Sequence, residues 1–182
     1  MQRKRPVEIY NTKFISPIGN MHLGMTDRGL CCVAWNDSSW DRFLDDVKRH
    51  FTVNFKSGES KFNGIKHELG QYFAGKLNHF STPVDLFTLT TFQKKVLKAA
   101  QAIEYGKVKS YHEIANETGC PDAYRAVGNA LGRNPVPIVI PCHRIIKTDG
   151  TLGGFGGGLE IKRYLLRLEN VDEKFLKDQN PL

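Results

Sequence analysis

Cysteine is scarce in this chain of 182 residues, and long apolar runs are absent. The four thiols are Cys31, Cys32, Cys120 and Cys142, and no two of them have the C-x-x-C spacing that is typical of zinc sites. We therefore expect no metal, and no motif predicts a cofactor. No apolar run reaches membrane-spanning length, and the basic residues 1–5 are followed by neither an apolar stretch nor a cleavage site. We expect an intracellular protein with reduced thiols and no membrane association.

Charge of one sign is not concentrated at either end of the chain. The formal net charge is +7, and the positive excess is shared almost equally by the two halves. Such a mild, even excess permits a polyanionic partner without demonstrating one. Hydrophobic residues make up 40% of the chain, which is enough to bury a core without disulfides.

Residues 1–88 predict a small mixed α/β domain. Runs of β-branched and apolar residues predict a strand and a hairpin over residues 8–16, 20–26 and 30–36. Apolar residues at helical spacing predict two helices, over residues 40–47 and 65–73. We find no catalytic motif in this half, and we interpret Cys31 and Cys32 as small apolar packing residues.

Residues 89–182 predict a mainly α domain with a winged helix-turn-helix. Two capping boxes, 90–93 and 110–113, each begin a helix, and Gly106 is expected to end the first. A turn then leads to a third helix, for which Asp122 is the expected N-cap. Helix, tight turn and helix form the helix-turn-helix shape, although many helical hairpins of this kind bind nothing.

The third helix carries small side chains opposite its buried residues Val127 and Leu131. These small residues are Ala123, Ala126, Gly128 and Ala130. Arg125 is the one long cation among them. Small residues allow a helix to approach a nucleic-acid groove closely while one long side chain is inserted into it. They equally allow two helices to pack tightly. The helix alone leaves both interpretations open.

A proline-rich segment, N-P-V-P-I-V-I-P-C-H-R over residues 134–144, holds the candidate nucleophile. We expect a short buried strand over 138–140, which Pro141 ends so that Cys142 is presented at its exit. A cysteine followed by His143 and Arg144 has cationic help in forming a thiolate, which is the reactive form.

This segment resembles the active-site signature of the O6-alkylguanine-DNA alkyltransferases, also called methylated-DNA–protein-cysteine methyltransferases. The flanking stretches Y-H-E-I-A, R-A-V-G-N-A-L-G-R-N-P and D-G-T-L-G-G-F-G-G-G-L-E-I-K-R-Y-L-L-R-L-E agree, so that the resemblance spans about residues 90–170. Weaker similarity lies at 16–19 and 72–75. The resemblance implies DNA repair by a single, irreversible transfer of an alkyl group from O6-alkylguanine to the protein, with activity on O4-alkylthymine left open.

The resemblance also implies a catalytic role for five residues. Cys142 corresponds to the alkyl acceptor, and His143 to the base that takes the thiol proton through a water. Glu169 corresponds to the carboxylate that orients this histidine. Asn134 corresponds to the asparagine that braces the active-site turn, and Tyr111 to the tyrosine that helps turn out the nucleotide and protonates the leaving guanine.

Further positions correspond to DNA contacts and to the substrate pocket of the family. Arg125 corresponds to the finger that fills the gap in the base stack. The other expected DNA contacts are Tyr111, Gln93, His112, Ala126, Gly128 and Thr148. The expected pocket residues are Phe155, Gly156, Gly157 and Ile145. Phe155 stands where many relatives have tyrosine, so any hydroxyl contact there is lost. The zinc-binding positions of some relatives do not match, which again predicts no metal.

The implied partner is double-stranded DNA containing O6-alkylguanine, bound by a monomer in the cytoplasm, or in the nucleus of a eukaryote. Three other functions use some of the same features. A cysteine hydrolase could use Cys142, His143 and Glu169 but would not need the small-residue helix with Arg125. Alkyltransferase-like DNA-binding proteins replace the cysteine, and a winged-helix transcription factor has no use for a Pro-Cys-His sequence.

Overall fold

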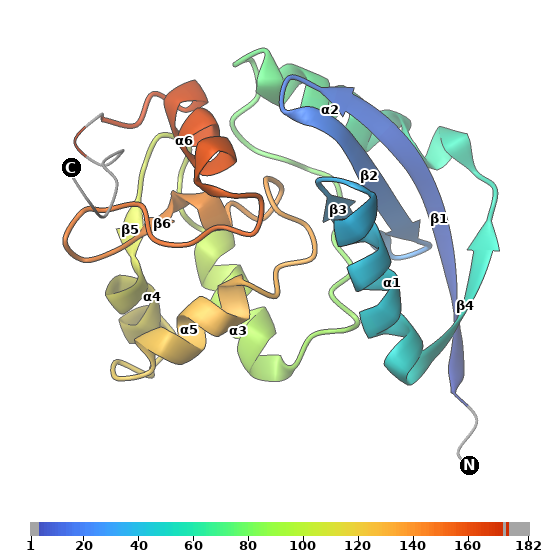
Figure 1. Ribbon diagram of the computed structural model, residues 1–182, viewed down its shortest axis with the longest axis horizontal. Coiled ribbons are helices and arrows are strands. Elements are labelled where there is room, and N and C mark those ends of the chain that lie inside the picture. The colour runs from blue at the N-terminus through green and yellow to red at the C-terminus, as the bar shows by residue number, and fades with distance from the viewer. Residues whose placement is uncertain (1–3, 173, 175–182) are drawn as a thin grey trace. The chain divides into compact units, whose positions relative to one another are not determined.

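The computed structural model describes residues 4–172 and Lys174 of the chain (Figure 1). The chain divides into two compact units, Met1–Thr88 and Leu89–Leu182. Parts of the basic N-terminal stretch and of the C-terminal domain considered above, residues 1–3, 173 and 175–182, lie outside the described residues.

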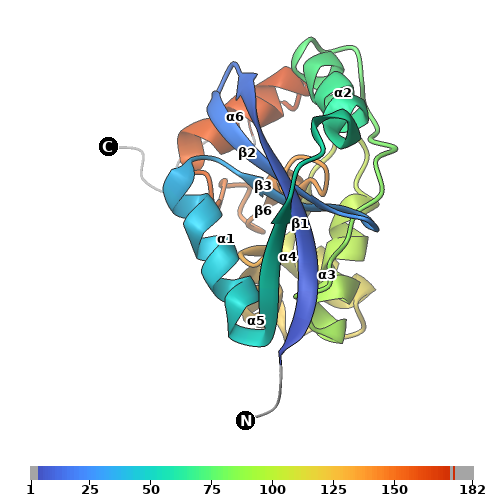
Figure 2. The ribbon, with the colours of Figure 1, turned by 90° about the vertical axis from the view of Figure 1, so that its right-hand side faces the viewer.

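The first unit contains a four-stranded mixed sheet. Its strands are β1 (Arg5–Ser16), β2 (Gly19–Thr26), β3 (Gly29–Ala34) and β4 (Phe51–Lys56), in the order β3-β2-β1-β4. The three predicted strands are confirmed, and β2 pairs antiparallel with both β1 and β3. β4 was not predicted; it runs parallel to β1, with Val7 opposite Val53. Figure 2 shows the two strands side by side.

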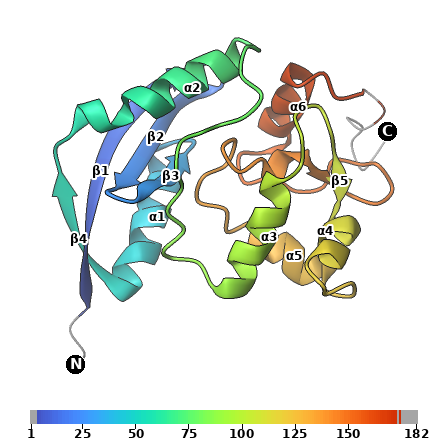
Figure 3. The ribbon, with the colours of Figure 1, turned by 180° about the vertical axis from the view of Figure 1, so that it is seen from behind.

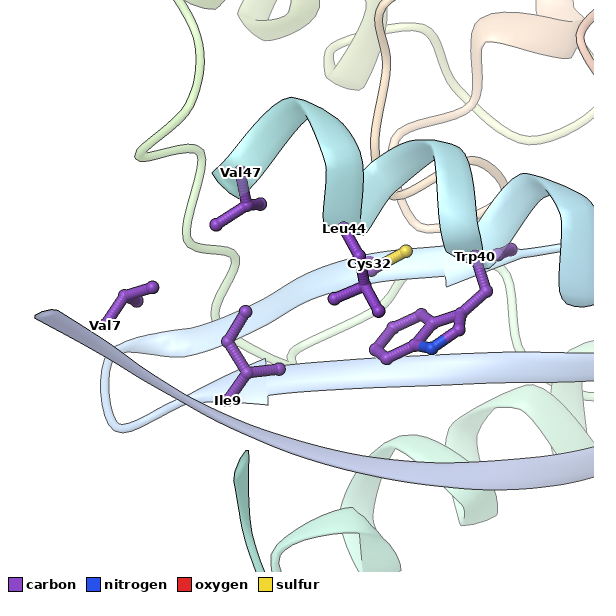
Figure 4. Close-up of a cluster of buried hydrophobic side chains, with 7 residues drawn as sticks. Val7, Ile9, Cys32, Trp40, Leu44 and Val47 are labelled. Atoms are coloured by element: carbon purple, nitrogen blue, oxygen red, sulfur yellow. The ribbon is translucent and has the colours of Figure 1, made fainter. Parts of the chain in front are cut away.

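Two α-helices and a short 3-10 helix, Glu59–Phe62, complete this unit. The α-helices are α1 (Asp37–His50) and α2 (Asn63–Phe73), and both were predicted. Asn36 caps α1 through a capping box with Ser39. Figure 4 shows α1 lying over the sheet with apolar side chains filling the space between them: Val7, Ile9, Cys32, Trp40, Leu44 and Val47. The thiol of Cys32 therefore belongs to the core, in agreement with its interpretation as a small apolar packing residue.

The second unit is mainly helical. Its elements are α3 (Thr91–Gln101), β5 (Lys109–Ser110), α4 (Tyr111–Glu117), α5 (Tyr124–Leu131), β6 (Ile145–Ile146) and α6 (Leu159–Leu168). Both predicted capping boxes are present, with Thr90 capping α3 and Ser110 capping α4. Figures 1 and 3 show α3, α4 and α5 packed together, with α6 at the other end of this unit. β5 and β6 form a short parallel pair.

Four local predictions for this unit were wrong. α3 ends at Gln101, well before Gly106. The N-cap of α5 is Ala123 rather than Asp122, and no side chain caps the helix. Ala130 lies on the buried side of α5, because it follows Val127 at helical spacing. Residues 138–140 form no strand; the chain there is irregular, with only an isolated bridge between Pro137 and Ile140.

Among the helices that the structure describes, none combines the length and the apolar character needed to cross a membrane.

Candidate active site

Cys142 begins a 3-10 turn, Cys142–Arg144, at the end of the proline-rich segment. The chain enters the turn through Ile138, which is buried and has φ of 74°. A β-branched residue in the left-handed region costs on the order of 1–3 kcal/mol, so the surrounding structure must hold it there. The side-chain amide of Asn134 supplies part of this hold, because its nitrogen donates to the Ile140 carbonyl at 2.9 Å and its oxygen accepts from the Val136 amide at 3.1 Å.

The same Asn134 nitrogen reaches the nucleophile. It donates to the Cys142 sulfur at 3.2 Å. Cys142 itself is partly buried. Burial raises the pKa of its thiol, while the hydrogen bond from Asn134 and the charge of Lys162 act to lower it. The net direction is upward, so the resting thiol keeps its proton, while Asn134 and Lys162 favour the thiolate when it forms.

His143 and Glu169 form a buried pair. The Nε2 atom of His143 lies 2.8 Å from Oε1 of Glu169, and both side chains are completely shielded from solvent. Burial raises the pKa of the Glu169 carboxyl, but hydrogen bonds and charges from His143 and Arg144 outweigh it and bring the pKa to about 2. Glu169 is therefore ionised and acts only as an acceptor.

The ionised carboxylate determines the tautomer of His143. Because Glu169 can only accept, Nε2 of His143 carries the proton. Burial lowers the pKa of the imidazole more than Glu169 raises it, so the ring is neutral. Its Nδ1 atom is then an unprotonated acceptor, and it is buried without a hydrogen-bond partner among the residues that the structure describes. A neutral, oriented imidazole next to a thiol in the chain is suited to act as a general base.

Arg144 does not serve the thiol, contrary to the sequence prediction. Its Nε and Nη2 atoms donate to Glu169 at 2.8 and 3.0 Å, and its Nη1 atom donates to the Ile103 carbonyl at 2.5 Å. Arg144 is therefore a structural partner of Glu169.

Lys162 is the residue that the sequence analysis missed. It is fully buried on α6, and its ammonium donates to the carbonyls of Ile145 at 2.6 Å, of Gly154 at 3.4 Å and of Leu152. Burial lowers its pKa to about 8, although the charge of Cys142 acts in the opposite direction. A signal was present, because Lys162 shares one helical face with Leu165, Leu166 and Glu169, where a solvated lysine would not be expected.

Tyr111 reaches the site because β5 pairs with β6. The register places Ser110 opposite Ile146, so that the first residue of α4 lies close to the chain that leaves the Cys142 turn. The Tyr111 hydroxyl donates to the Gly154 carbonyl at 3.4 Å. A Cβ at Gly153 would lie 3.0 Å from the tyrosine ring, so this position suits glycine. Burial, and then the charge of Cys142, raises the pKa of Tyr111, which keeps its proton available.

Two open hollows border α5. One has a volume of about 590 Å³ and is lined by Tyr111, His112, Tyr124, Gly128, Lys147, Thr148, Asp149, Gly153 and Gly154. The other has a volume of about 550 Å³ and is lined by Thr90, Phe92, Gln93, Ala126, Gly128, Asn129, Ala130, Gly132 and Arg133. Arg125 is exposed on the same helix. The residues expected to contact DNA are thus gathered around α5.

Comparison with known proteins identifies the family. Residues 9–86 match the family description "6-O-methylguanine DNA methyltransferase, ribonuclease-like domain", and residues 91–171 match "6-O-methylguanine DNA methyltransferase, DNA binding domain". The methylated-DNA–protein-cysteine methyltransferase of Mycolicibacterium paratuberculosis is 42% identical over 154 residues, which cover 85% of this chain and 88% of that protein. This chain belongs to that methyltransferase family.

Solved structures agree with this family assignment. The Mycobacterium tuberculosis O6-methylguanine methyltransferase is similar with a TM-score of 0.73 and 37% identity, covering 94% of this chain and 96% of that one. The Mycobacterium tuberculosis OGT in complex with DNA is similar with a TM-score of 0.72 and 37% identity, covering 93% and 98%. The predicted family and the predicted fold class are confirmed.

The four residues expected to form the methyltransferase pocket lie in different surroundings. The Phe155 ring meets the His143 ring edge to face, with 6.4 Å between the ring centroids. Gly156 and Gly157 belong to the loop that precedes α6, whereas Ile145 is fully buried and offers its carbonyl to Lys162. Their contact with substrate stays a prediction.

No group of three or more His, Cys, Asp or Glu side chains within residues 4–172 is arranged to hold a metal ion.

Proposed function

We propose that this methyltransferase repairs DNA by moving an alkyl group from O6 of a guanine to the sulfur of Cys142. The observation that carries the proposal is the buried pair of His143 and Glu169, which leaves Nδ1 of a neutral imidazole without a partner among the described residues. The half-buried thiol belongs to the preceding residue of the chain. A water between Nδ1 and the thiol would satisfy this orphaned atom and carry the proton.

The transfer can be written with the chain's own groups. The thiol proton passes to Nδ1 of His143, and Glu169 stabilises the imidazolium that forms. The thiolate of Cys142 attacks the alkyl carbon from the side opposite the oxygen. A carbon–sulfur bond forms, the carbon–oxygen bond breaks, and its electron pair stays on the guanine.

The leaving guanine requires a proton, for which Tyr111 is the donor in this proposal. Its raised pKa keeps the hydroxyl protonated at neutral pH. The proton that reached His143 can return to Tyr111 through solvent, so that the products are a thioether and a neutral guanine. A thioether offers no activated carbonyl or sulfur to water, and each molecule therefore acts once.

Access to the damaged base requires that its nucleotide leaves the duplex, because O6 of guanine lies inside the helix. We propose that α5 approaches a groove of double-stranded DNA and that Arg125 fills the gap that the nucleotide leaves. The small residues Ala126 and Gly128 would allow this approach. Gln93, His112 and Thr148, which line the two hollows beside α5, would contact the flanking strand.

The decisive experiment titrates an excess of O6-methylguanine duplex against a known amount of protein. We expect a plateau at about one repaired base per molecule, a mass increase of one methyl group, and a modified peptide that contains Cys142. Sustained turnover would instead support a cysteine hydrolase or another true catalyst, and a methyl group on another residue would overturn the assignment of the acceptor.

Four finer points complete the proposal and are tested separately. Single-stranded and O4-methylthymine oligonucleotides measure the preference for double-stranded DNA and for guanine. Light scattering with and without DNA tests whether the protein is a monomer. We place the protein with the chromosome, in the cytoplasm or in a eukaryotic nucleus, because its substrate is there, and imaging of a tagged chain tests this.

A further inference from the structure

Tyr124 is an aromatic side chain that neither the family motif nor the proposed chemistry uses. It is the first residue of α5, and helical spacing places it on the same stripe as the buried residues Val127 and Leu131. It nevertheless remains 47% exposed. The first residue of α5 therefore presents an aromatic ring to solvent, next in the chain to the exposed Arg125.

The surroundings of Tyr124 are those of a binding surface. Its side chain lines the 590 Å³ hollow together with Tyr111 and His112, so that two tyrosines from α4 and α5 border one cavity. Cavities of several hundred Å³ with aromatic lining are suited to small planar ligands, and a nucleotide base is one. The hollow also contains Lys147, whose charge suits a phosphate.

Tyr124 also contacts the proposed finger residue. The guanidinium carbon of Arg125 lies 5.7 Å from the centroid of the Tyr124 ring. Cation–π contact of this kind restricts a long, exposed side chain that would otherwise sample many rotamers. A finger that is already restrained loses less conformational entropy when it enters the base stack.

We propose that Tyr124 is a further DNA-contact residue, whose ring stacks on the nucleotide that leaves the duplex and orients Arg125 before it enters the gap. This inference rests on the proposed function. Stacking on an aromatic ring does not depend on which base is present, because every base has a π face. Tyr124 therefore promotes extrusion of the nucleotide and takes no part in the transfer of the alkyl group.

The test compares duplex repair with the reaction of a free base. Tyr124→Ala, Tyr124→Phe and the matched control Tyr164→Ala are each reacted with an O6-methylguanine duplex and with free O6-benzylguanine. Tyr164 is a suitable control because it is 36% exposed, on α6. We expect Tyr124→Ala to lower the rate on the duplex about ten-fold and the rate on the free base far less. Tyr124→Phe keeps the ring and should stay close to the wild type.

A second readout follows extrusion directly. A duplex with 2-aminopurine beside O6-methylguanine fluoresces when the stack opens, and we expect a smaller rise with Tyr124→Ala than with Tyr164→Ala. Each single variant, Tyr124→Ala or Arg125→Ala, lowers the rate of duplex repair by some factor. The double variant should lower that rate by less than the product of the two factors, because the two side chains act together.

The outcomes separate this inference from the proposed function. Equal losses on duplex and free base, or a Tyr124→Ala variant that matches Tyr164→Ala on the duplex, would overturn the role of Tyr124 while leaving the transfer intact. Failure of the wild-type protein to accept an alkyl group from either substrate would instead overturn the proposed function.

Discussion

The thiols of β3 are buried and the thiol of the Cys142–Arg144 turn is half-buried, and different groups surround them. Cys31 and Cys32 lie in a strand whose every residue is buried. Burial raises the pKa of both, and the negative charge of Asp85 adds to the effect at Cys31. Among the described residues, no cation and no side-chain donor acts on the pKa of either thiol.

Burial also raises the pKa of the Cys142 thiol, but groups around the sulfur act in the opposite direction. Asn134 donates a hydrogen bond to the sulfur, and the buried ammonium of Lys162 supplies positive charge. The comparison teaches that burial alone makes a cysteine inert. A buried cysteine becomes a candidate nucleophile when donors and cations converge on it and a base lies beside it.

The largest effect is expected from removing the candidate nucleophile itself. Cys142→Ser should abolish alkyl transfer while duplex binding persists, because the proposed groove contacts lie around α5. Cys120→Ser, which changes a half-buried thiol in the same unit, should transfer normally. Intact-protein mass after incubation with O6-methylguanine duplex measures both, and a methylated Cys142→Ser protein would refute the comparison.

A second effect concerns acid stability through Glu169. Its pKa of about 2 in the folded protein lies below its ordinary value of 4.5. The ionised form is therefore favoured by folding, so the stabilisation is present above about pH 4.5 and is lost as the pH falls toward 2. Its size is on the order of 3 kcal/mol, since each pKa unit corresponds to about 1.4 kcal/mol.

Urea unfolding of the wild type and of Glu169→Gln at pH 7, 5 and 3 measures the stabilisation that ionised Glu169 supplies. We expect the stability difference between the two proteins to shrink as the pH falls. Glu160→Gln is the control, because Glu160 is an exposed residue of the same helix paired with Arg163. A difference between wild type and Glu169→Gln that is independent of pH would show that Glu169 is not ionised in the fold.

A smaller effect is expected at Asn134. Asn134→Ala removes the donor to the Cys142 sulfur, so the pKa of the thiol should rise and transfer at pH 7 should slow by about 10- to 100-fold, as expected for a hydrogen bond to a charged group. Asn116→Ala, an exposed change on α4, should have no such effect. The pH–rate profile of Asn134→Ala shows whether the loss comes from a raised thiol pKa. A profile with the same midpoint as the wild type would mean that Asn134 only holds the backbone.

The smallest effect is a difference in labelling under native conditions. Iodoacetamide at neutral pH should modify Cys142 and Cys120, which are partly accessible, and leave Cys31 and Cys32 unmodified until the protein unfolds. Peptide mapping before and after denaturation measures this. Rapid native labelling of Cys31 or Cys32 would show that β3 opens readily and would weaken the contrast between the two regions.

The sequence by itself determined the elements whose signals are local. Capping boxes at Thr90 and Ser110 located the starts of α3 and α4, because capping involves residues only three positions apart. Apolar spacing located α1 and α2. The motif around Cys142 named the candidate nucleophile, its histidine and, through resemblance, Glu169 and Tyr111.

Only the tertiary structure decided the partners that lie far apart in the chain. The parallel pairing of β4 with β1 joins segments about 45 residues apart, and Arg144 turned out to bind Glu169 rather than serve Cys142. Residues 138–140 failed to form a strand, because Ile138 is held in the left-handed region by contacts that no local preference encodes. Lys162 is charged and would be solvated on most helices. It supports the site only because three backbone carbonyls converge on its ammonium, and that convergence exists only in the folded chain.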